Sequence, residues 1–164
     1  MTPHSPVDLH LHSTASDGTL GPAALVAHVA ARGVRLMALT DHDTVSGVAA
    51  AAAAARSAGI GFVPGVELSA TWRGRAVHVL GLAVDPESPG LKAALAGQKS
   101  RREARAVRIA ARLDDAGAPG RAALDRIHAE GSLPTRTHFA RALVALGAAA
   151  DLGAAFERWL GRGR

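Results

Sequence analysis

The chain has 164 residues, of which 48% are hydrophobic, which is enough to build one ordinary domain or a domain with a small appendage. It contains no cysteine, which excludes disulfides and thiolate metal sites, so a metal ion would have to be held by imidazole and carboxylate groups. The formal net charge of +5 allows an anionic partner without requiring one.

The first half of the chain alternates strand and helix patterns. Short apolar or alternating runs predict four strands, at Val7–Leu11, Val34–Thr40, Ile60–Val66 and Ala76–Val84, the last after a turn at Arg73-Gly74. The first helix begins at Pro22 and stops before Gly33, and the second is capped by Ser46 and ended by Gly59. Strands separated by helices of this length are typical of parallel β-α-β units, so this half predicts an α/β fold.

The composition changes at residues 85–90, where Asp, Pro, Ser and Gly predict a turn or linker. Beyond this point the chain reads as almost wholly helical. The expected helices are Leu91–Ala116, Arg121–Glu130 and Thr135–Leu146, with a fourth at Asp151–Leu160. We therefore divide the chain into an α/β part, residues 1–89, and a helical part, residues 90–164.

His10 and His12 are separated by one residue on the first predicted strand. Alternate residues of a strand point to one face, so both imidazoles and the Asp8 carboxylate are expected to project together. This geometry suits one cation, although a pair of polar residues at a sheet edge has the same pattern. The strand then runs into a polar loop that carries Asp17.

Further candidate ligands follow the next three strands. The segment Thr40-Asp41-His42-Asp43 comes directly after the second strand, Glu67 closes the third, and His78 lies in the fourth. In α/β sheets and barrels the chemistry collects at the carboxyl ends of the strands. Because chance would scatter such residues, we infer one metal site. Its candidate ligands are His10, His12, Asp17, His42, Glu67 and His78.

Taken together, these motifs resemble the PHP (polymerase and histidinol phosphatase) family. The resemblance is greatest to stand-alone bacterial phosphoesterases, which include nucleoside 3′,5′-bisphosphate phosphatases and 5′-to-3′ exoribonucleases. It covers residues 7–85 motif by motif and extends more loosely through residues 134–141 to the terminal residues 160–163. The resemblance implies the N-terminal portion of a distorted (β/α)₇ TIM-like barrel, with residues 90–164 as a helical insertion that caps the site.

The resemblance also implies two or three divalent ions, of Mn, Zn or Fe. His10 and His12 would hold one ion, and Glu67 would bridge two. His78 would serve the second ion, and Asp17 and His42 would serve a third position. A metal-activated hydroxide would then hydrolyse phosphate mono- or diesters of nucleotides or of RNA 5′ ends, which makes these the expected partners.

Other polar residues are expected to support the site. Asp8, Asp41 and Asp43 are placed to orient the imidazoles, or else to form loop turns and caps. By resemblance, Arg136, His138 and Arg141 would contact a substrate phosphate. Four arginines of the long helix share one face, which either steers nucleotides or is simply a solvated surface: Arg101, Arg105, Arg108 and Arg112.

Two alternatives to the phosphoesterase remain open. Relatives of this type are expected to continue past residue 164 and to add a further His and a late Asp-x-His, so the chain could be a catalytically incomplete PHP module that acts as a binding or vestigial domain. It could also be a metal-dependent hydrolase of a non-phosphate bond, such as an amide. No apolar run is long enough to span a bilayer and no signal peptide is recognised, so we expect a cytoplasmic protein without membrane contact.

Overall fold

A computed structural model describes residues 6–161 of the chain. The chain divides into two compact units, residues 1–98 and residues 99–164, and each is described by itself. In the described range, no helix combines the length and the apolar character needed to cross a membrane. The first five residues, where we expect no signal peptide, lie outside the described range.

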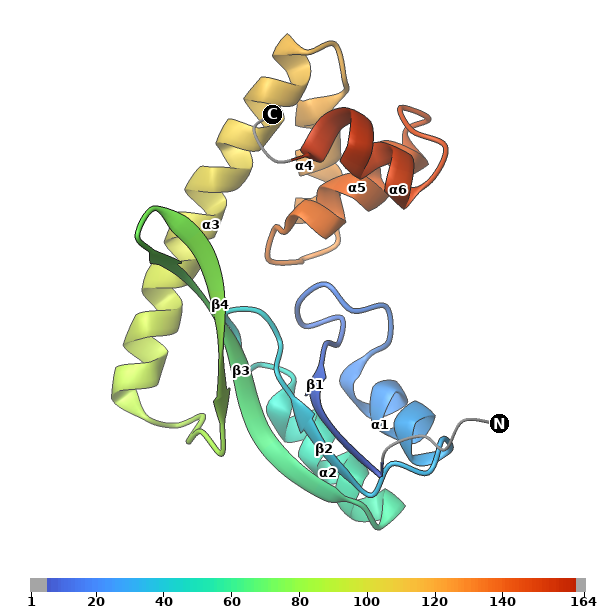
Figure 1. Cartoon of the computed structure of the whole chain (residues 1–164), viewed down its shortest axis with the longest axis vertical. Helices are drawn as coiled ribbons and strands as arrows, with labels where there is room; N and C mark the ends of the chain where they lie inside the picture. Colours follow the sequence, from blue (N-terminus) through green and yellow to red (C-terminus); the bar gives the residue numbers. More distant parts are fainter. Residues whose placement is uncertain (1–5, 162–164) are drawn as a thin grey trace. The chain divides into compact units, whose positions relative to one another are not determined.

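Unit 1 is built on one sheet with the strand order β1-β2-β3-β4 (Figure 1). Strands β1 (Val7–Leu11) and β2 (Leu36–Leu39) are parallel, and β2 is also parallel to the beginning of β3 (Gly61–Trp72). Strand β4 (Arg75–Leu82) pairs antiparallel with the remainder of β3. The predicted parallel β-α-β units are therefore confirmed for the first three strands, and a hairpin adds the fourth.

Two helices separate the parallel strands, as predicted. Helix α1 (Pro22–Ala30) and helix α2 (Val48–Ala58) pack with the sheet around fully buried Met37 and Leu39. Because α2 contributes mainly alanines to this core, its backbone can approach the strands closely.

The start of α2 differs from the prediction. Its N-cap is Gly47 and not Ser46, whose hydroxyl instead accepts a hydrogen bond from Thr44 Oγ1. A Cβ at position 47 would lie 3.0 Å from a Leu39 methyl carbon and 3.1 Å from an Asp41 carboxylate oxygen. Close packing behind β2 therefore favours glycine at the N-cap position, where a larger residue would displace neighbouring side chains.

Strand β3 is longer than the predicted strand Ile60–Val66, because it changes partner part of the way along. Residues up to Pro64 pair with β2, and residues from Gly65 onward pair with β4. A Cβ at Gly65 would lie 2.8 Å from Thr40 Cγ2 and 2.9 Å from the Leu39 carbonyl oxygen, so the crossing point needs glycine. The predicted turn at Arg73-Gly74 then closes the hairpin.

Unit 2 is helical, as predicted. Helix α3 (Pro89–Asp115) extends into it from unit 1, and α4 (Gly120–Ala129), α5 (Arg136–Ala145) and α6 (Leu152–Ala155) follow. The helix predicted at Asp151–Leu160 is α-helical for one turn and then π-helical in η1 (Phe156–Leu160).

The core of unit 2 is centred on Ile127, Phe139 and Leu143, which are all at most 1% exposed. Helix α3 contributes Ala106 and Ala110 to this core, while the four arginines of the predicted stripe are exposed. Ala106 and Ala110 therefore lie on a different face of α3 from the four-arginine stripe, although Arg102 is also buried.

Candidate metal centre

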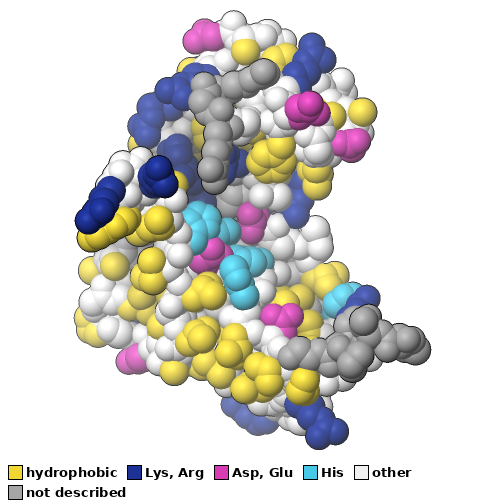
Figure 2. Space-filling view, viewed as in Figure 1, with side chains coloured by type: hydrophobic (Ala, Val, Ile, Leu, Met, Phe, Trp, Pro, Cys, Tyr) yellow, Lys and Arg dark blue, Asp and Glu magenta, His cyan; other side chains and the backbone are white. Residues whose placement is uncertain are grey.

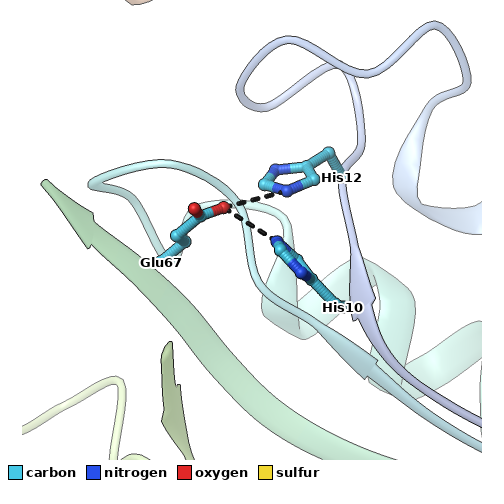
Figure 3. A group of neighbouring side chains, drawn as sticks. All are labelled: His10, His12 and Glu67. Carbon is cyan, nitrogen blue, oxygen red and sulfur yellow. Dashed lines mark hydrogen bonds and ion pairs between the residues drawn. The ribbon is translucent and has the colours of Figure 1, made fainter. Parts of the chain in front are cut away.

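The candidate ligands predicted from the sequence gather around a single buried carboxylate, Glu67. His10 Nε2 and His12 Nε2 each lie 3.0 Å from Glu67 Oε2 (Figure 3). The two imidazoles project from the same side of β1, as the alternation of strand residues predicts. The parallel sheet thus brings His10 and Glu67, which are 57 residues apart in the chain, into contact.

Two further histidines reach the same carboxylate from the neighbouring elements. His42, just after β2, places Nδ1 3.5 Å from Glu67 Oε2. His78 places Nδ1 2.6 Å from Glu67 Oε1. In the β3–β4 ladder His78 is paired with Ser69, which is on the same face as Glu67 and two residues away, so the contact is diagonal across the hairpin.

The sixth candidate, Asp17, comes from the loop after β1. Its Oδ1 lies 3.9 Å from both His12 Nδ1 and His42 Nε2. The loop turns back on itself because the Ser13 carbonyl oxygen accepts hydrogen bonds from the N–H groups of Ser16 and Gly18. A Cβ on Gly18 would lie 2.2 Å from the His12 carbonyl oxygen, so this close return needs glycine.

The donor atoms fall into three overlapping groups that could each hold a cation. The groups are His10, His12 and Glu67; His12, Asp17 and His42; and His42, Glu67 and His78. Within each group the donor atoms lie within 4.8 Å of one another. Mixed imidazole and carboxylate donors suit zinc, manganese and iron, so the residues present fit divalent ions. Glu67 belongs to two groups, which is the arrangement that a bridging carboxylate requires.

The histidines hold Glu67 in its ionised form. Burial by itself raises the pKa of this carboxyl group, which is only 4% exposed. The hydrogen bond with His10, the charge of His42, the hydrogen bond with His78 and the charge of His12 together outweigh burial and lower the pKa of Glu67 below its ordinary value. A negative charge is therefore kept at the floor of the site, where it favours a cation.

The carboxylate of Asp41 fastens the loop that carries Asp17. It accepts hydrogen bonds from the Ser13 N–H at 2.7 Å, the Ser13 hydroxyl at 2.7 Å and the Ser16 hydroxyl at 2.6 Å. Ser16 Oγ also lies 3.4 Å from His12 Nδ1. Ser16, which the sequence did not single out as part of the site, therefore links Asp41 to His12, and support of the imidazoles by Asp41 stays a prediction.

The other two predicted supporting carboxylates bond to the backbone. Asp43 Oδ1 accepts a hydrogen bond from the Ser69 N–H at 2.7 Å, and Asp8 Oδ1 accepts one from the His10 N–H at 3.3 Å. The Asp8 contact is local, whereas the Asp43 contact joins the segment after β2 to β3. Orientation of the imidazoles by these two residues stays a prediction. Asp43 adopts a φ of 51°, a left-handed conformation that aspartate tolerates better than most residues.

The predicted substrate-binding residues belong to α5 in unit 2. Arg136 is exposed, Arg141 is partly buried, and His138 is 6% exposed. The His138 N–H donates to the hydroxyl of Thr135, the N-cap of α5, and His138 Nδ1 lies 3.1 Å from that hydroxyl. The ring thus has a structural role at the start of the helix, and contact of these three residues with a substrate stays a prediction.

A PHP domain model matches residues 8–117. The chain is 46% identical over 157 residues to a 5′-3′ exoribonuclease of Haemophilus influenzae, covering 96% of this chain and 57% of the relative. It is 43% identical over 161 residues to a 3′,5′-nucleoside bisphosphate phosphatase of Chromobacterium violaceum, covering 96% of this chain and 56% of the relative. The chain therefore spans about half the length of these curated relatives.

The fold has a close counterpart among solved structures. An amidohydrolase from Chromobacterium violaceum, with bound sulfate and no metal, superposes with a TM-score of 0.88 at 41% sequence identity. The match covers 98% of this chain and 57% of that one, which confirms the predicted N-terminal portion of a PHP barrel. The family model, the identities and the superposition agree with the motifs around Glu67, and this chain belongs to the PHP domain family.

Proposed function

We propose that the protein is a metal-dependent phosphoesterase that hydrolyses phosphate mono- or diesters of nucleotides or of RNA 5′ ends. The observation that carries the proposal is the convergence of four imidazoles on the two carboxylate oxygens of Glu67, with Asp17 close by. The names of the relatives, an exoribonuclease and a nucleoside bisphosphate phosphatase, support the substrate class.

Burial supports different tasks for Glu67 and for the imidazoles at the rim. Buried Glu67 forms the floor of the site, whereas the His10 and His78 side chains are 52% and 49% exposed and leave the opposite side open to a substrate. The three donor groups support two or three ion positions. Divalent ions bound there would supply a nucleophile at neutral pH and neutralise the charge of the phosphoryl oxygens.

The test is phosphate release from adenosine 3′,5′-bisphosphate by the purified chain, with added manganese and with chelator. Release that requires metal, and that His42→Ala abolishes, is the expected result. His128→Ala is the matched control, because His128 is exposed on α4 and pairs with Glu103 in unit 2. The same assay on the longer protein would show whether residues beyond the present chain are needed.

Amide hydrolysis is the second candidate, because the solved relative is named an amidohydrolase. A panel of phosphoester and amide substrates at one manganese concentration separates the two reactions. Cleavage of amides alone would reject the phosphoesterase proposal. Metal binding without turnover of either class would instead identify a binding module.

A further inference from the structure

The tip of the β3–β4 hairpin carries an exposed tryptophan among arginines. Trp72 is 65% exposed, more than any other large hydrophobic side chain of the described residues. The Cζ atom of Arg73 lies 5.7 Å from the centre of the indole ring, and Arg75 faces Trp72 in the strand register. A flat aromatic surface and two guanidinium groups are therefore presented to solvent at one place.

The hairpin holds this group in a defined position. The antiparallel pairing continues from Gly65–Leu82 to Trp72–Arg75, so the strands are joined up to the tip. The turn residues Arg73 and Gly74 both have positive φ, at 48° and 76°, which is the two-residue turn that matches the twist of a hairpin. A ligand that stacks on Trp72 would therefore find a preordered surface and little entropy would be lost on binding.

The charge around the tip is one-sided. Between Glu67 and Asp85 the chain has no acidic residue, while Arg73 and Arg75 are exposed. Figure 2 shows Lys and Arg side chains over the hairpin tip, on the same visible face of unit 1 as the cluster of His side chains. An exposed aromatic ring with cations and no carboxylates is the combination that single-stranded nucleic acids recognise, by base stacking and phosphate contact.

The tip is also connected to the metal centre by the same two strands. Trp72 lies five residues beyond Glu67, about 17 Å along β3, and Arg75 lies three residues from His78, about 10 Å along β4. Strand alternation places Trp72 and Glu67 on opposite faces of the hairpin. Because β4 is an edge of the described sheet, a single-stranded nucleic acid can pass over that edge from one face of the hairpin to the other.

We propose that the hairpin tip is a stacking platform for a base of single-stranded RNA, several nucleotides away from the phosphate at the metal centre. The inference rests on the proposed function for the position of the reacting phosphate. It makes an oligonucleotide, rather than a mononucleotide, the ligand that uses the whole surface of unit 1.

The two tryptophans of the chain allow a direct test. The other tryptophan, Trp159, lies in unit 2. In a Trp159→Phe variant of the full chain, all tryptophan fluorescence therefore comes from Trp72. Short single-stranded oligoadenylate is added in the presence of chelator, so that no hydrolysis interferes. Saturable quenching of Trp72 fluorescence is the expected result.

The affinity of substituted variants for labelled oligoadenylate then shows which residues of the tip contact the RNA. Trp72→Ala is expected to weaken binding about tenfold. Replacement of Arg73 or Arg75 by alanine should reduce the slope of log affinity against log salt by about 0.7 for each phosphate that is no longer neutralised. Arg56→Ala is the matched control, because Arg56 is an exposed arginine on α2 in the same unit. Circular dichroism checks that each variant is folded.

Three results would overturn the inference. The first is equal quenching by base-free polyphosphate, and the second is unchanged RNA binding in Trp72→Ala. The third is a loss of self-association in that variant without any loss of RNA binding, which would identify the tip as an interface between copies of the chain. The failures of the two proposals are distinguishable. Metal-dependent phosphate release without RNA quenching rejects the platform alone, and RNA quenching without phosphate release rejects the phosphoesterase alone.

Discussion

Glu67 is the residue on which the candidate site depends most. Its Oε2 atom lies close to the rings of His10 and His12, and its Oε1 atom lies close to the ring of His78. Two of the three possible cation positions therefore include Glu67. The sequence identified this glutamate as a ligand but placed it at the end of a strand. In the structure it lies inside β3, where a parallel bridge joins it to His42 and antiparallel pairing joins it to β4, so candidate ligands reach it from both sides.

Replacement of Glu67 by glutamine should therefore affect metal more than fold. We expect Glu67→Gln to lower the number of tightly bound manganese ions and to weaken the remaining binding by at least about tenfold, because the bridging negative charge is lost. Isothermal titration calorimetry and elemental analysis would measure both effects. Glu87→Gln, at a carboxylate with an 82% exposed side chain, is the control and should bind metal normally.

The lowered pKa of Glu67 gives the metal-free chain a pH-dependent stability. Because the folded-state pKa is below the ordinary value of 4.5, the unfolded chain takes up this proton first. The contribution of Glu67 is thus fully present above that value and is lost as the pH falls through the lower folded-state pKa. Urea unfolding with chelator at a series of pH values should show this acid loss in the wild type. An equal loss in Glu67→Gln would contradict the assignment.

At the scale of elements, the loop of residues 13–18 is held to the end of β2 by Asp41. This carboxylate is 1% exposed and accepts three hydrogen bonds, while Ser13 and Ser16 are themselves buried. The loop carries Asp17 to the site, so a break in this anchor should disturb both folding and metal binding. The sequence showed the polar loop and Asp41 as separate features, but their contact depends on the pairing of β1 with β2.

Two substitutions separate these roles. Asp41→Ala leaves the loop donors without their acceptor and should lower the free energy of unfolding by about 1–3 kcal/mol. Ser16→Ala removes only the bonds to Asp41 and His12, so it should weaken metal binding with a smaller loss of stability. Denaturant unfolding and metal titration of both variants test this order. If Ser16→Ala binds metal like the wild type, Ser16 does not position His12.

At the scale of the whole molecule, metal binding should be linked to thermal stability. An ion that binds only the folded chain stabilises it by about 2.7 kcal/mol at a concentration 100 times its dissociation constant. We therefore expect manganese to raise the melting temperature and chelator to reverse the rise. In His42→Ala the rise should be strongly reduced, whereas His128→Ala should retain it. An equal rise in both variants would place the bound ion elsewhere.

The relative length of the chain matters at this scale too. It spans about half of the curated relatives, and the sheet has exposed apolar residues on its edge strand β4, including Val79 and Leu82. Exposed apolar residues of this kind are expected where part of a barrel leaves a strand edge open. The phosphate-release assay, run on this chain and on the longer protein, would show how much of the activity the present 164 residues support.

Residue type and local periodicity were sufficient to predict most of the elements and to select the six candidate donors that the structure brings together. The parallel β-α-β units, the turn at Arg73-Gly74 and the helical second half all follow from properties of neighbouring residues. The three-dimensional structure was needed to show which candidate donors share an oxygen, that Ser16 contacts His12, and that Gly47 replaces Ser46 as a cap. The reason is distance along the chain: contacts between residues as far apart as His10 and Glu67 are set by sheet register and close packing, which no local pattern encodes.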